Sequence, residues 1–437
     1  MVGDIEDIFE EELKARPIFK NLDVLSPHYV PEELPHRDAE IKDISRILAP
    51  VVRNEKPNNI FIYGKTGTGK TCVVRLVKRK LEGFVSNPEK NPANAVIRNI
   101  YMNCKVLNSK YQVLLKTAES GNLNDGSLTD NPLADRGGKG LMGMTSVDLY
   151  ERVKKVVESN SINLILILDE IDQIKKGGGF DDLIYGLTRI NDELSAGSIS
   201  VVCMSNDIRV VKKLGPRTKS TLCEEEMVFE PYNAIQLGTI LKQRIYDLEG
   251  FKKDSIDESA IALISAIAAQ DGDARYALKL LQKSGEIAKN GGDVKVLDDH
   301  VEKAKKKVEE DIIYDAISTL PEQQQIVLYS IAKLVMRGGM YGLLNKIRRG
   351  NCGYETLSNG ILTSGDVFSE YERQCEELNR HPRTMRSFET YLNELEMLGL
   401  ITMKISGKGF RGNTRLIRLG YPPKDIEQIV KKNFNLE

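Results

Sequence analysis

One glycine-rich segment limits the possible folds of this chain more than any other. FIYGKTGTGKTCVVRL, residues 61–76, passes from an apolar, β-prone strand through Gly64-x-x-x-x-Gly69-Lys70-Thr71 into a helix with an apolar side. Small residues at this spacing let successive backbone N–H groups converge on phosphate oxygens, and the helix N-terminus adds a positive dipole. The segment predicts a polyphosphate site made of Gly64, Lys65, Thr66, Gly67, Thr68, Gly69, Lys70, Thr71 and Cys72.

Two side chains of this loop have specific expected roles. Lys70 would reach the β- and γ-phosphates, and the Thr71 hydroxyl would hold Mg²⁺. The alternative is an ordinary glycine-rich turn, which the strand before the loop and the helix after it disfavour.

A second segment supplies the carboxylates that such a site needs. INLILILDEID, residues 162–172, is typical of a strand buried on both faces of a parallel sheet, with acidic residues at its carboxyl end, where ligands bind in such sheets. We expect Asp169 to anchor Mg²⁺ and Glu170 to polarise the attacking water. The alternative, an acidic pair that caps a helix, explains Asp172 better than Asp169 and Glu170 together.

Composition sets broad limits. A chain of 437 residues exceeds one hydrophobic core and indicates two to four domains. The net charge is −1, from 62 basic and 63 acidic residues, so any nucleic-acid surface must be local.

The six cysteines form no C-x-x-C pair and the four histidines are scattered, which indicates neither a zinc site nor a disulfide framework. An acidic N-terminus and short apolar runs predict a soluble cytoplasmic protein with no membrane partner, associated with the nucleoid if it binds DNA.

The first half of the chain alternates strand and helix patterns. We expect strands at 60–63, 96–103, 162–168 and 199–205, and helices at 70–82, 108–120, 147–159 and 181–195. This alternation predicts a parallel sheet flanked by helices, with 121–143 as a long mobile loop. After Pro231 four helices follow, at 234–248, 256–269, 273–289 and 296–309. The predicted domains are 1–230, 231–310 and 311–437.

The last third predicts three helices, at 321–335, 364–378 and 381–398, then two strands, at 400–405 and 414–419. This is the order of a winged helix, in which the third helix meets base edges. We expect its inner face to hold Met385, Phe388, Leu392, Leu395 and Leu398. Its outer face, near the N-terminus, would present Arg383, Thr384, Arg386, Ser387 and Thr390.

Basic charge is concentrated in the same region. Residues 380–418 hold eight Lys/Arg and three Glu, a local charge of +5. The hairpin tip places Lys408, Arg411 and Arg415 around Phe410, a composition suited to phosphate and minor-groove contacts. The alternative is a solvated basic hairpin on a winged helix that contacts protein.

Together these motifs resemble the archaeal replication initiators of the AAA+ class, which are similar to the largest subunit of the eukaryotic origin recognition complex and to the cell-division-control helicase loader. The resemblance covers essentially the whole chain. It rests on YGKTGTGKT, LILDEID, CMSND (203–207), PRTKSTLCEEEMVFEPYNAIQL (216–237), DGDARYALKLL (271–281) and LNELEMLGLI. It implies an α/β P-loop AAA+ domain, an all-α lid and a C-terminal winged helix.

The resemblance also implies roles for single residues. Asn206 resembles the sensor-1 residue, Arg275 the sensor-2 arginine and Arg217 the arginine finger that completes a neighbouring protomer's site. Val30, Pro31 and Arg37 would line the adenine pocket. An initiator-specific insertion at about 104–145 would contact DNA through Lys110, Tyr111 and Lys116, and Lys105 is a further candidate.

The implied function is a replication initiator whose ATPase acts as a slow switch. It would bind ATP or ADP with Mg²⁺, double-stranded origin DNA, the replicative helicase and other initiator protomers. Two alternatives are an ADP-bound winged-helix transcription regulator and an AAA+ ATPase that remodels protein. Three features depart from the family pattern: the length of 121–143, Cys223 where a glycine is usual, and the segment 338–362 with Lys346, Arg348 and Arg349.

Overall fold

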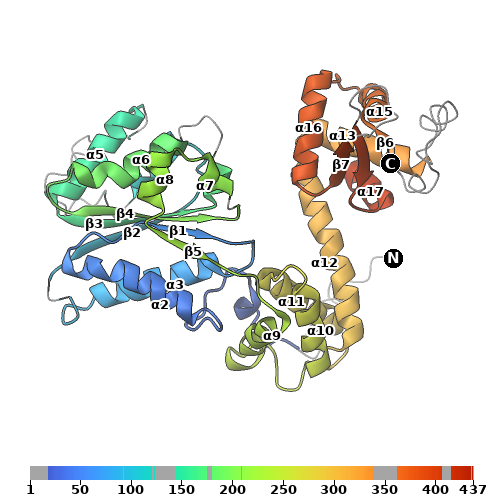
Figure 1. Ribbon diagram of the computed structural model, residues 1–437. Coiled ribbons are helices and arrows are strands. Elements are labelled where there is room, and N and C mark those ends of the chain that lie inside the picture. Colours follow the sequence, from blue (N-terminus) through green and yellow to red (C-terminus); the bar gives the residue numbers. More distant parts are fainter. Residues whose placement is uncertain are drawn as a thin grey trace. The chain divides into compact units, whose positions relative to one another are not determined.

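A computed structural model describes residues 18–91, 93–120, 123, 141, 143–174, 180–207, 209–337, 362–405, 415–434 and 436 (Figure 1). Most of the predicted loop 121–143 and nearly all of the segment 338–362 lie outside these residues. The chain divides into two compact units, Met1–Ala304 and Lys305–Glu437. Within the described residues, no helix is both long and apolar enough to cross a membrane.

A five-stranded parallel sheet organises the first unit, in the order β2-β3-β4-β1-β5. The strands are β1 (Ile60–Tyr63), β2 (Val96–Asn103), β3 (Ile162–Asp169), β4 (Ser198–Ser205) and β5 (Glu225–Val228). β3 and β4 are buried along their whole length, as strands covered on both faces must be. The four predicted strands are confirmed, whereas β5 was missed because its sequence, EEMV, belongs to a half-exposed edge.

Helices cover both faces of this sheet (Figure 1). They are α2 (Asp38–Leu48), α3 (Lys70–Val85), α4 (Lys110–Glu119), α5 (Ser146–Ser159), α6 (Phe180–Arg189), α7 (Arg209–Lys213) and α8 (Pro216–Leu222). One core packs α4, α5 and α6 against the sheet, and the other packs α2 and α3 against its opposite face. The predicted helix 181–195 ends at Arg189, where a 3-10 turn, Ile190–Asp192, begins.

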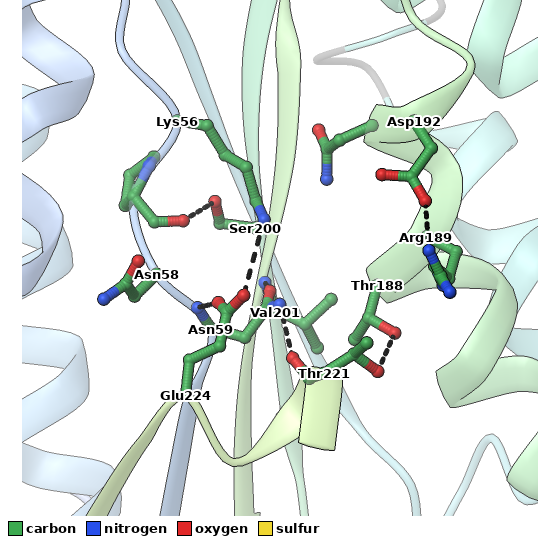
Figure 2. Close-up of polar contacts among 12 residues, drawn as sticks. Lys56, Asn58, Asn59, Thr188, Arg189, Asp192, Ser200, Val201, Thr221 and Glu224 are labelled. Atoms are coloured by element: carbon green, nitrogen blue, oxygen red, sulfur yellow. Dashed lines mark hydrogen bonds and ion pairs between the residues drawn. The ribbon is translucent and has the colours of Figure 1, made fainter. Parts of the chain in front are cut away.

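A polar network connects the elements at the end of the sheet where β1 begins, which we call the amino edge (Figure 2). Asn59, which precedes β1, is fully buried. Its Oδ1 accepts from the Val201 N–H of β4 and its Nδ2 donates to the Thr221 carbonyl of α8, both at 2.9 Å. The Asn59 N–H donates to Glu224 Oε2 at 2.6 Å, and Lys56 pairs with the same carboxylate. This network fixes β1 and β4 to the segment between α8 and β5.

The remaining helices of the first unit form a lid. They are α9 (Ala234–Lys242), a π-helical turn (Gln243–Asp247), α10 (Glu258–Ala268), α11 (Ala274–Asn290) and the start of α12 (Asp298–Ser318). The four predicted helices are present, and α12 extends nine residues beyond its expected end. An isolated antiparallel β-bridge between Phe19 and Phe251 connects the N-terminal segment to the lid. The centroids of the two phenyl rings lie 5.0 Å apart.

The second unit has the predicted winged-helix order. It contains α13 (Glu322–Met336), β6 (Leu362–Thr363), α15 (Ser364–Glu377), α16 (Met385–Met397), β7 (Ile401–Ile405), β8 (Arg415–Leu419) and α17 (Pro423–Asn433). The antiparallel sheet has the order β6-β8-β7. The short β6 and the C-terminal α17 were not predicted.

The inner face of α16 is narrower than expected. Phe388, Leu392 and Leu395 are fully buried, as predicted. The prediction was wrong for Met385 and Leu398, whose side chains are 40% and 55% exposed. The Thr384 hydroxyl caps α16, so the helix begins at Met385 and not before Pro382. The helix ends at Met397, so Met385 is its first residue and Leu398 follows its last.

Candidate nucleotide site and nucleic-acid interface

The glycine-rich loop lies between β1 and α3 and is closed by contacts that only glycine permits. A Cβ on Gly64 would lie 2.5 Å from the Phe229 carbonyl oxygen. Gly67 (φ 71°) would meet the Asp273 carboxylate at 1.8 Å, and Gly69 (φ 89°) the Tyr232 hydroxyl at 2.7 Å. Both positive φ values suit glycine. The loop is thus a backbone cradle of the kind that phosphate requires.

Lys70 lies buried beneath this loop. Its Nζ donates to the carbonyl oxygens of Gly64 and Lys65, each at 2.7 Å. A third bond, 2.9 Å long, goes to Asn206 Oδ1, so the structure brings the loop lysine and the sensor-1 candidate together. Burial lowers the pKa of Lys70 to about 8, although the nearby Asp169 carboxylate acts in the opposite direction. A nearby phosphate charge would raise this pKa again and so favour the cationic form further.

The side-chain carboxylate of Asp169, at the end of β3, receives three hydrogen bonds. Its Oδ2 accepts from Thr71 Oγ1 at 2.8 Å and from the Tyr101 hydroxyl at 2.7 Å. Its Oδ1 accepts from the Glu170 N–H at 2.9 Å. Burial, followed by the Asp169 charge, raises the pKa of Tyr101 to about 12, which keeps the phenol a donor. A hydroxyl and a carboxylate side by side are the hard oxygen donors that Mg²⁺ prefers.

Glu170 has two features typical of a functional residue. Its backbone is left-handed, with φ 54° and ψ 45°, a conformation that costs a non-glycine residue free energy. Its Oε2 is buried and, among the described residues, has no hydrogen-bond partner. Glu170 lines the polar end of the cleft together with Asn206 and Arg275. An unpaired buried carboxylate oxygen facing a phosphate cradle fits a group that must bind water.

In the described part of the chain, Asp172 does not cap a helix, as the alternative interpretation of this acidic segment would require. Its Oδ1 accepts from the Ser205 hydroxyl and from the Asn206 N–H, both at 3.0 Å. It therefore links the 3-10 turn after β3 to the end of β4 and orients Asn206. Neither this role nor that of Tyr101 was predicted, because both depend on which strands are neighbours.

The cleft between sheet and lid continues from the loop as a larger, mainly apolar cavity of about 580 Å³, part of which is open to solvent. Arg275, on the first turn of α11, lines both parts of the cleft, and the Ala274 N–H donates to the Gly67 carbonyl at 3.2 Å. The apolar part is lined by Pro27, Leu34, Pro35, Gly67, Gly69, Thr71, Cys72, Tyr232, Ile240, Gln243, Arg244, Ala274, Arg275 and Leu278. A lid that contacts the loop can respond to what the loop holds.

The three predicted adenine-pocket residues lie beside this cavity in different ways. The carbonyls of Val30 and Pro31 accept from Arg79, and the cavity wall uses Pro27, Leu34 and Pro35 from the same segment. Arg37 is buried and its guanidinium is hydrogen-bonded to the backbone of the loop. It donates to the Thr68 carbonyl at 3.1 Å, the Tyr232 hydroxyl at 2.9 Å and the Glu230 carbonyl at 2.7 Å. Base contacts of these three residues stay predictions.

Other loop residues have distinct surroundings. Lys65 and Thr66 are exposed, and Thr68 is buried with its hydroxyl donating to the Lys65 carbonyl at 2.9 Å. Cys72 follows Thr71 into α3 and lines the apolar part of the cleft. Geometry, burial and donor chemistry together fit a nucleoside polyphosphate with Mg²⁺.

Arg217 is exposed on the first turn of α8, a helix anchored at both ends. The Gly215 N–H donates to Asp181 of α6 at 2.9 Å. The hydroxyls of Thr188 and Thr221 lie 2.8 Å apart (Figure 2). The nearby Cys223 has φ −92°, so its backbone does not require a glycine.

The winged helix presents basic side chains at the start of α16. Arg383 and Arg386 are exposed, and the Thr384 hydroxyl caps the helix by accepting from the Ser387 N–H. The Arg383 N–H donates to the Tyr371 hydroxyl at 2.9 Å, which fixes the approach to the helix. On β8, Arg415 donates to Asn393 of α16 at 2.8 Å. Lys408, Phe410 and Arg411 lie outside the described residues.

The insertion candidates lie on and before α4. Lys105 and Lys116 are exposed. Lys110 is half-buried beside a groove between α4, α5 and α6. Tyr111 packs partly against the core under α4, which leaves only part of its ring for another contact. Their roles stay predictions.

Family models match three segments of the chain. Residues 33–189 match an AAA ATPase domain, 238–306 a Cdc6 AAA+ ATPase-type lid domain, and 353–429 the CDC6 C-terminal winged helix domain. These matches confirm the predicted fold class: a P-loop α/β domain, a helical lid and a winged helix. An AAA ATPase domain is a nucleotide-binding domain, in agreement with the geometry of the loop.

Whole-chain relatives agree with these domain matches. The ORC1-type DNA replication protein of Pyrococcus furiosus is 38% identical over 99% of this chain and 94% of its own length. ORC1-type DNA replication protein 1 of Sulfurisphaera tokodaii is 38% identical over 98% and 96%. Among solved structures, the Aeropyrum pernix ORC1 protein in complex with DNA has a TM-score of 0.78 at 34% identity, covering 95% of this chain and 97% of that one. Cdc6p from Pyrobaculum aerophilum, at 22% identity and a TM-score of 0.55, covers 96% and 99% and shares the fold.

Proposed function

This chain belongs to the family of ORC1-type DNA replication proteins, and from that premise we propose that it is a replication initiator that binds origin duplex DNA. Nucleotide binding and slow ATP hydrolysis act as its switch. The observation that carries the proposal is the combination, in one chain, of a phosphate cradle that contacts the lid with a capped helix that presents Arg383 and Arg386.

The nucleotide lies in the cleft between sheet and lid. Its phosphates occupy the loop 64–71, where Lys70 exchanges its bonds to loop carbonyls for bonds to phosphate oxygens. Arg275 links the phosphates to the lid, so the position of α11 depends on the nucleotide. Thr71 and Asp169 would hold Mg²⁺, whose charge would neutralise charge on the phosphate oxygens.

Hydrolysis requires little more than positioning. Glu170 accepts a hydrogen bond from the attacking water through its unpaired Oε2. Asn206, whose N–H donates to Asp172, helps to orient the water. The strained backbone of Glu170 holds its carboxylate at a fixed place. Arg217, exposed on α8, completes the site of a neighbouring protomer. A switch built this way need not turn over quickly.

DNA is held by the second unit and by the insertion. The helix N-terminus of α16 and the guanidinium groups of Arg383 and Arg386 contact phosphates and base edges. Lys110, Tyr111 and Lys116 provide a second contact from the AAA+ domain. The replicative helicase and other initiator protomers are the expected protein partners, and the protein works in the cytoplasm at the nucleoid.

The test is to recover and sequence fragments of sheared host DNA that the purified protein binds at near-physiological salt. We expect enrichment at a few loci that coincide with replication start sites. Arg386→Ala should weaken binding and reduce the salt dependence by roughly one phosphate contact. Lys424→Ala, an exposed change on α17, is the matched control.

Three outcomes would contradict the proposal. Uniform recovery of fragments would indicate that the protein binds DNA without sequence selectivity. Unchanged DNA affinity in both Arg383→Ala and Arg386→Ala would refute the assignment of α16. If Lys70→Ala leaves DNA affinity and its nucleotide dependence unchanged, the nucleotide is structural and the protein is better explained as a regulator.

A further inference from the structure

Tyr101 lies next to the metal position, although no motif marks it. It is on β2, whose register with β3 places it opposite Ile167, two residues before Asp169. Its hydroxyl reaches forward along the sheet and donates to Asp169 Oδ2 at 2.7 Å. This oxygen is also the acceptor for Thr71 Oγ1. Two hydroxyls from different elements therefore meet on one carboxylate oxygen.

The ring of Tyr101 is itself held in place. The Arg75 guanidinium, from the second turn of α3, lies over the ring with its carbon 4.5 Å from the ring centroid. Tyr101 is half-buried and Arg75 is exposed. The contact fixes the ring between α3, which carries Thr71, and β3, which ends in Asp169. Arg75, Tyr101 and Asp169 thus form a short chain of contacts from the surface to the metal position.

The other restraints on the Asp169 carboxylate are few. Oδ1 accepts from the neighbouring Glu170 N–H, and the Asp169 carbonyl accepts from the Cys104 N–H at 2.8 Å. The second of these fixes the backbone and leaves the side-chain torsions free. Among the described contacts of Oδ2, only the Tyr101 hydroxyl comes from outside the loop-helix segment. Without it, the carboxylate could turn away from Thr71.

We propose that Tyr101 is a positioning residue for the metal–nucleotide complex, with Arg75 as its support. Its hydroxyl holds the Asp169 carboxylate beside Thr71, so that both oxygens are in place before Mg²⁺ binds. The inference rests on the proposed nucleotide function. The inference distinguishes the Mg²⁺ dependence of nucleotide binding from nucleotide binding itself. Tyr101 affects the metal position through Asp169, whereas the contacts of the loop with phosphate do not involve Tyr101.

The experiment measures the affinity of a fluorescent ATP analogue as a function of Mg²⁺ concentration, and again in excess EDTA. In Tyr101→Phe the ring and its contact with Arg75 remain and only the hydroxyl is lost. We expect the Mg²⁺ concentration at half-saturation to rise roughly tenfold, as when other partners of metal ligands are removed. Affinity without Mg²⁺ should match the wild type. Arg75→Gln should give a smaller rise, about two- to fivefold.

Three comparisons distinguish this role from a structural one. Tyr150→Phe removes a similar half-buried hydroxyl, 3.5 Å from the Gly186 carbonyl and away from the loop, and should leave the Mg²⁺ titration unchanged. The melting temperature in EDTA should be the same in Tyr101→Phe and Tyr150→Phe. An equal loss of affinity with and without Mg²⁺ in Tyr101→Phe would show general damage to the site and overturn the inference.

Asp169→Asn separates the inference from its premise. If wild-type affinity depends on Mg²⁺ and Asp169→Asn loses this dependence, the metal site is supported. Tyr101→Phe titrating like wild type would then overturn the role of Tyr101 alone. If Mg²⁺ does not change the affinity of the wild type, the metal site and the inference both fail.

Discussion

The amino edge of the parallel sheet, where β1 begins, and the carboxyl edge, where the strands end, differ in how completely their polar groups are hydrogen-bonded. At the amino edge, Asn59 uses both ends of its amide on backbone groups, and Glu224 accepts from a backbone N–H and pairs with Lys56 (Figure 2). At the carboxyl edge, Glu170 has a left-handed backbone and an unpaired buried oxygen, and Lys70 is buried with a lowered pKa. The amino edge is complete without a ligand. The carboxyl edge has donors and acceptors that a nucleotide would pair.

This difference separates stability from function within one sheet. Backbone partners satisfy the amino edge, so changes there should cost folding free energy and leave nucleotide affinity alone. Strain and burial at the carboxyl edge are conditions that functional residues tolerate because a ligand or reaction uses them. Changes there should alter nucleotide binding and hydrolysis more than stability.

The largest expected effect is that of Glu170→Gln. The amide keeps the shape but loses the charge that polarises water, so single-turnover ATP hydrolysis should fall by about 10²- to 10⁴-fold. Nucleotide affinity should stay within about threefold, measured by equilibrium titration. Glu224→Gln is the matched acid at the amino edge and should leave hydrolysis unchanged while lowering the melting temperature. Equal hydrolysis in Glu170→Gln and wild type would remove Glu170 from the mechanism.

Lys70→Met comes next. Losing charge-assisted hydrogen bonds to phosphate should weaken ATP and ADP binding by roughly 100-fold, as titration of a fluorescent analogue would measure. The side-chain volume is nearly conserved, so far-ultraviolet circular dichroism should match the wild type. Lys65→Met, an exposed change in the same loop, should weaken binding far less. Comparable losses in both variants would indicate only a diffuse charge effect.

Asn59→Leu tests the amino edge. The Val201 N–H and the Thr221 carbonyl would lose their partner, so the free energy of unfolding should fall by about 2 kcal/mol in denaturant titrations. Nucleotide affinity should not change at temperatures where the variant is folded. Asn58→Leu, at the exposed neighbouring residue, should change stability by less than about 0.5 kcal/mol. A large loss of nucleotide affinity in Asn59→Leu would show that the two edges are coupled.

The smallest effect is a pH dependence. The pKa of Lys70 is about 8 in the folded, nucleotide-free protein and 10.5 as its ordinary value, so the unfolded chain binds more protons between these pH values. The contribution of Lys70 to the free energy of unfolding therefore rises with pH across this window, by about 1 kcal/mol from pH 8 to 9. Phosphate favours the charged lysine, so ATP affinity should fall roughly fivefold over the same step.

Comparison with Lys70→Met isolates this contribution, since other lysines and tyrosines also titrate above pH 9. The difference between wild type and variant should follow the curve expected for one group near pH 8. If wild type and Lys70→Met have parallel pH profiles of stability and affinity, another group is responsible.

The sequence by itself determined the parts of this protein that are encoded in short segments. The spacing of Gly64, Gly69, Lys70 and Thr71 specifies a phosphate cradle locally, because the converging N–H groups belong to consecutive residues. The run of Ile and Leu before Asp169 likewise specifies a strand buried on both faces. The order of helices and strands after residue 320 indicated the winged helix, since each element has its own period.

Only the tertiary structure decided which distant residues meet. β5 was not predicted because its EEMV sequence becomes a strand only through pairing with β1. Tyr101 and Asp172 reach their partners through the register of neighbouring strands, and Arg37 supports the loop from a position about 30 residues earlier. Met385 and Leu398 fit the helical period but are exposed, because burial depends on where a helix begins, ends and packs. Local chemistry follows from spacing along the chain, whereas these contacts follow from register and packing between segments far apart in sequence.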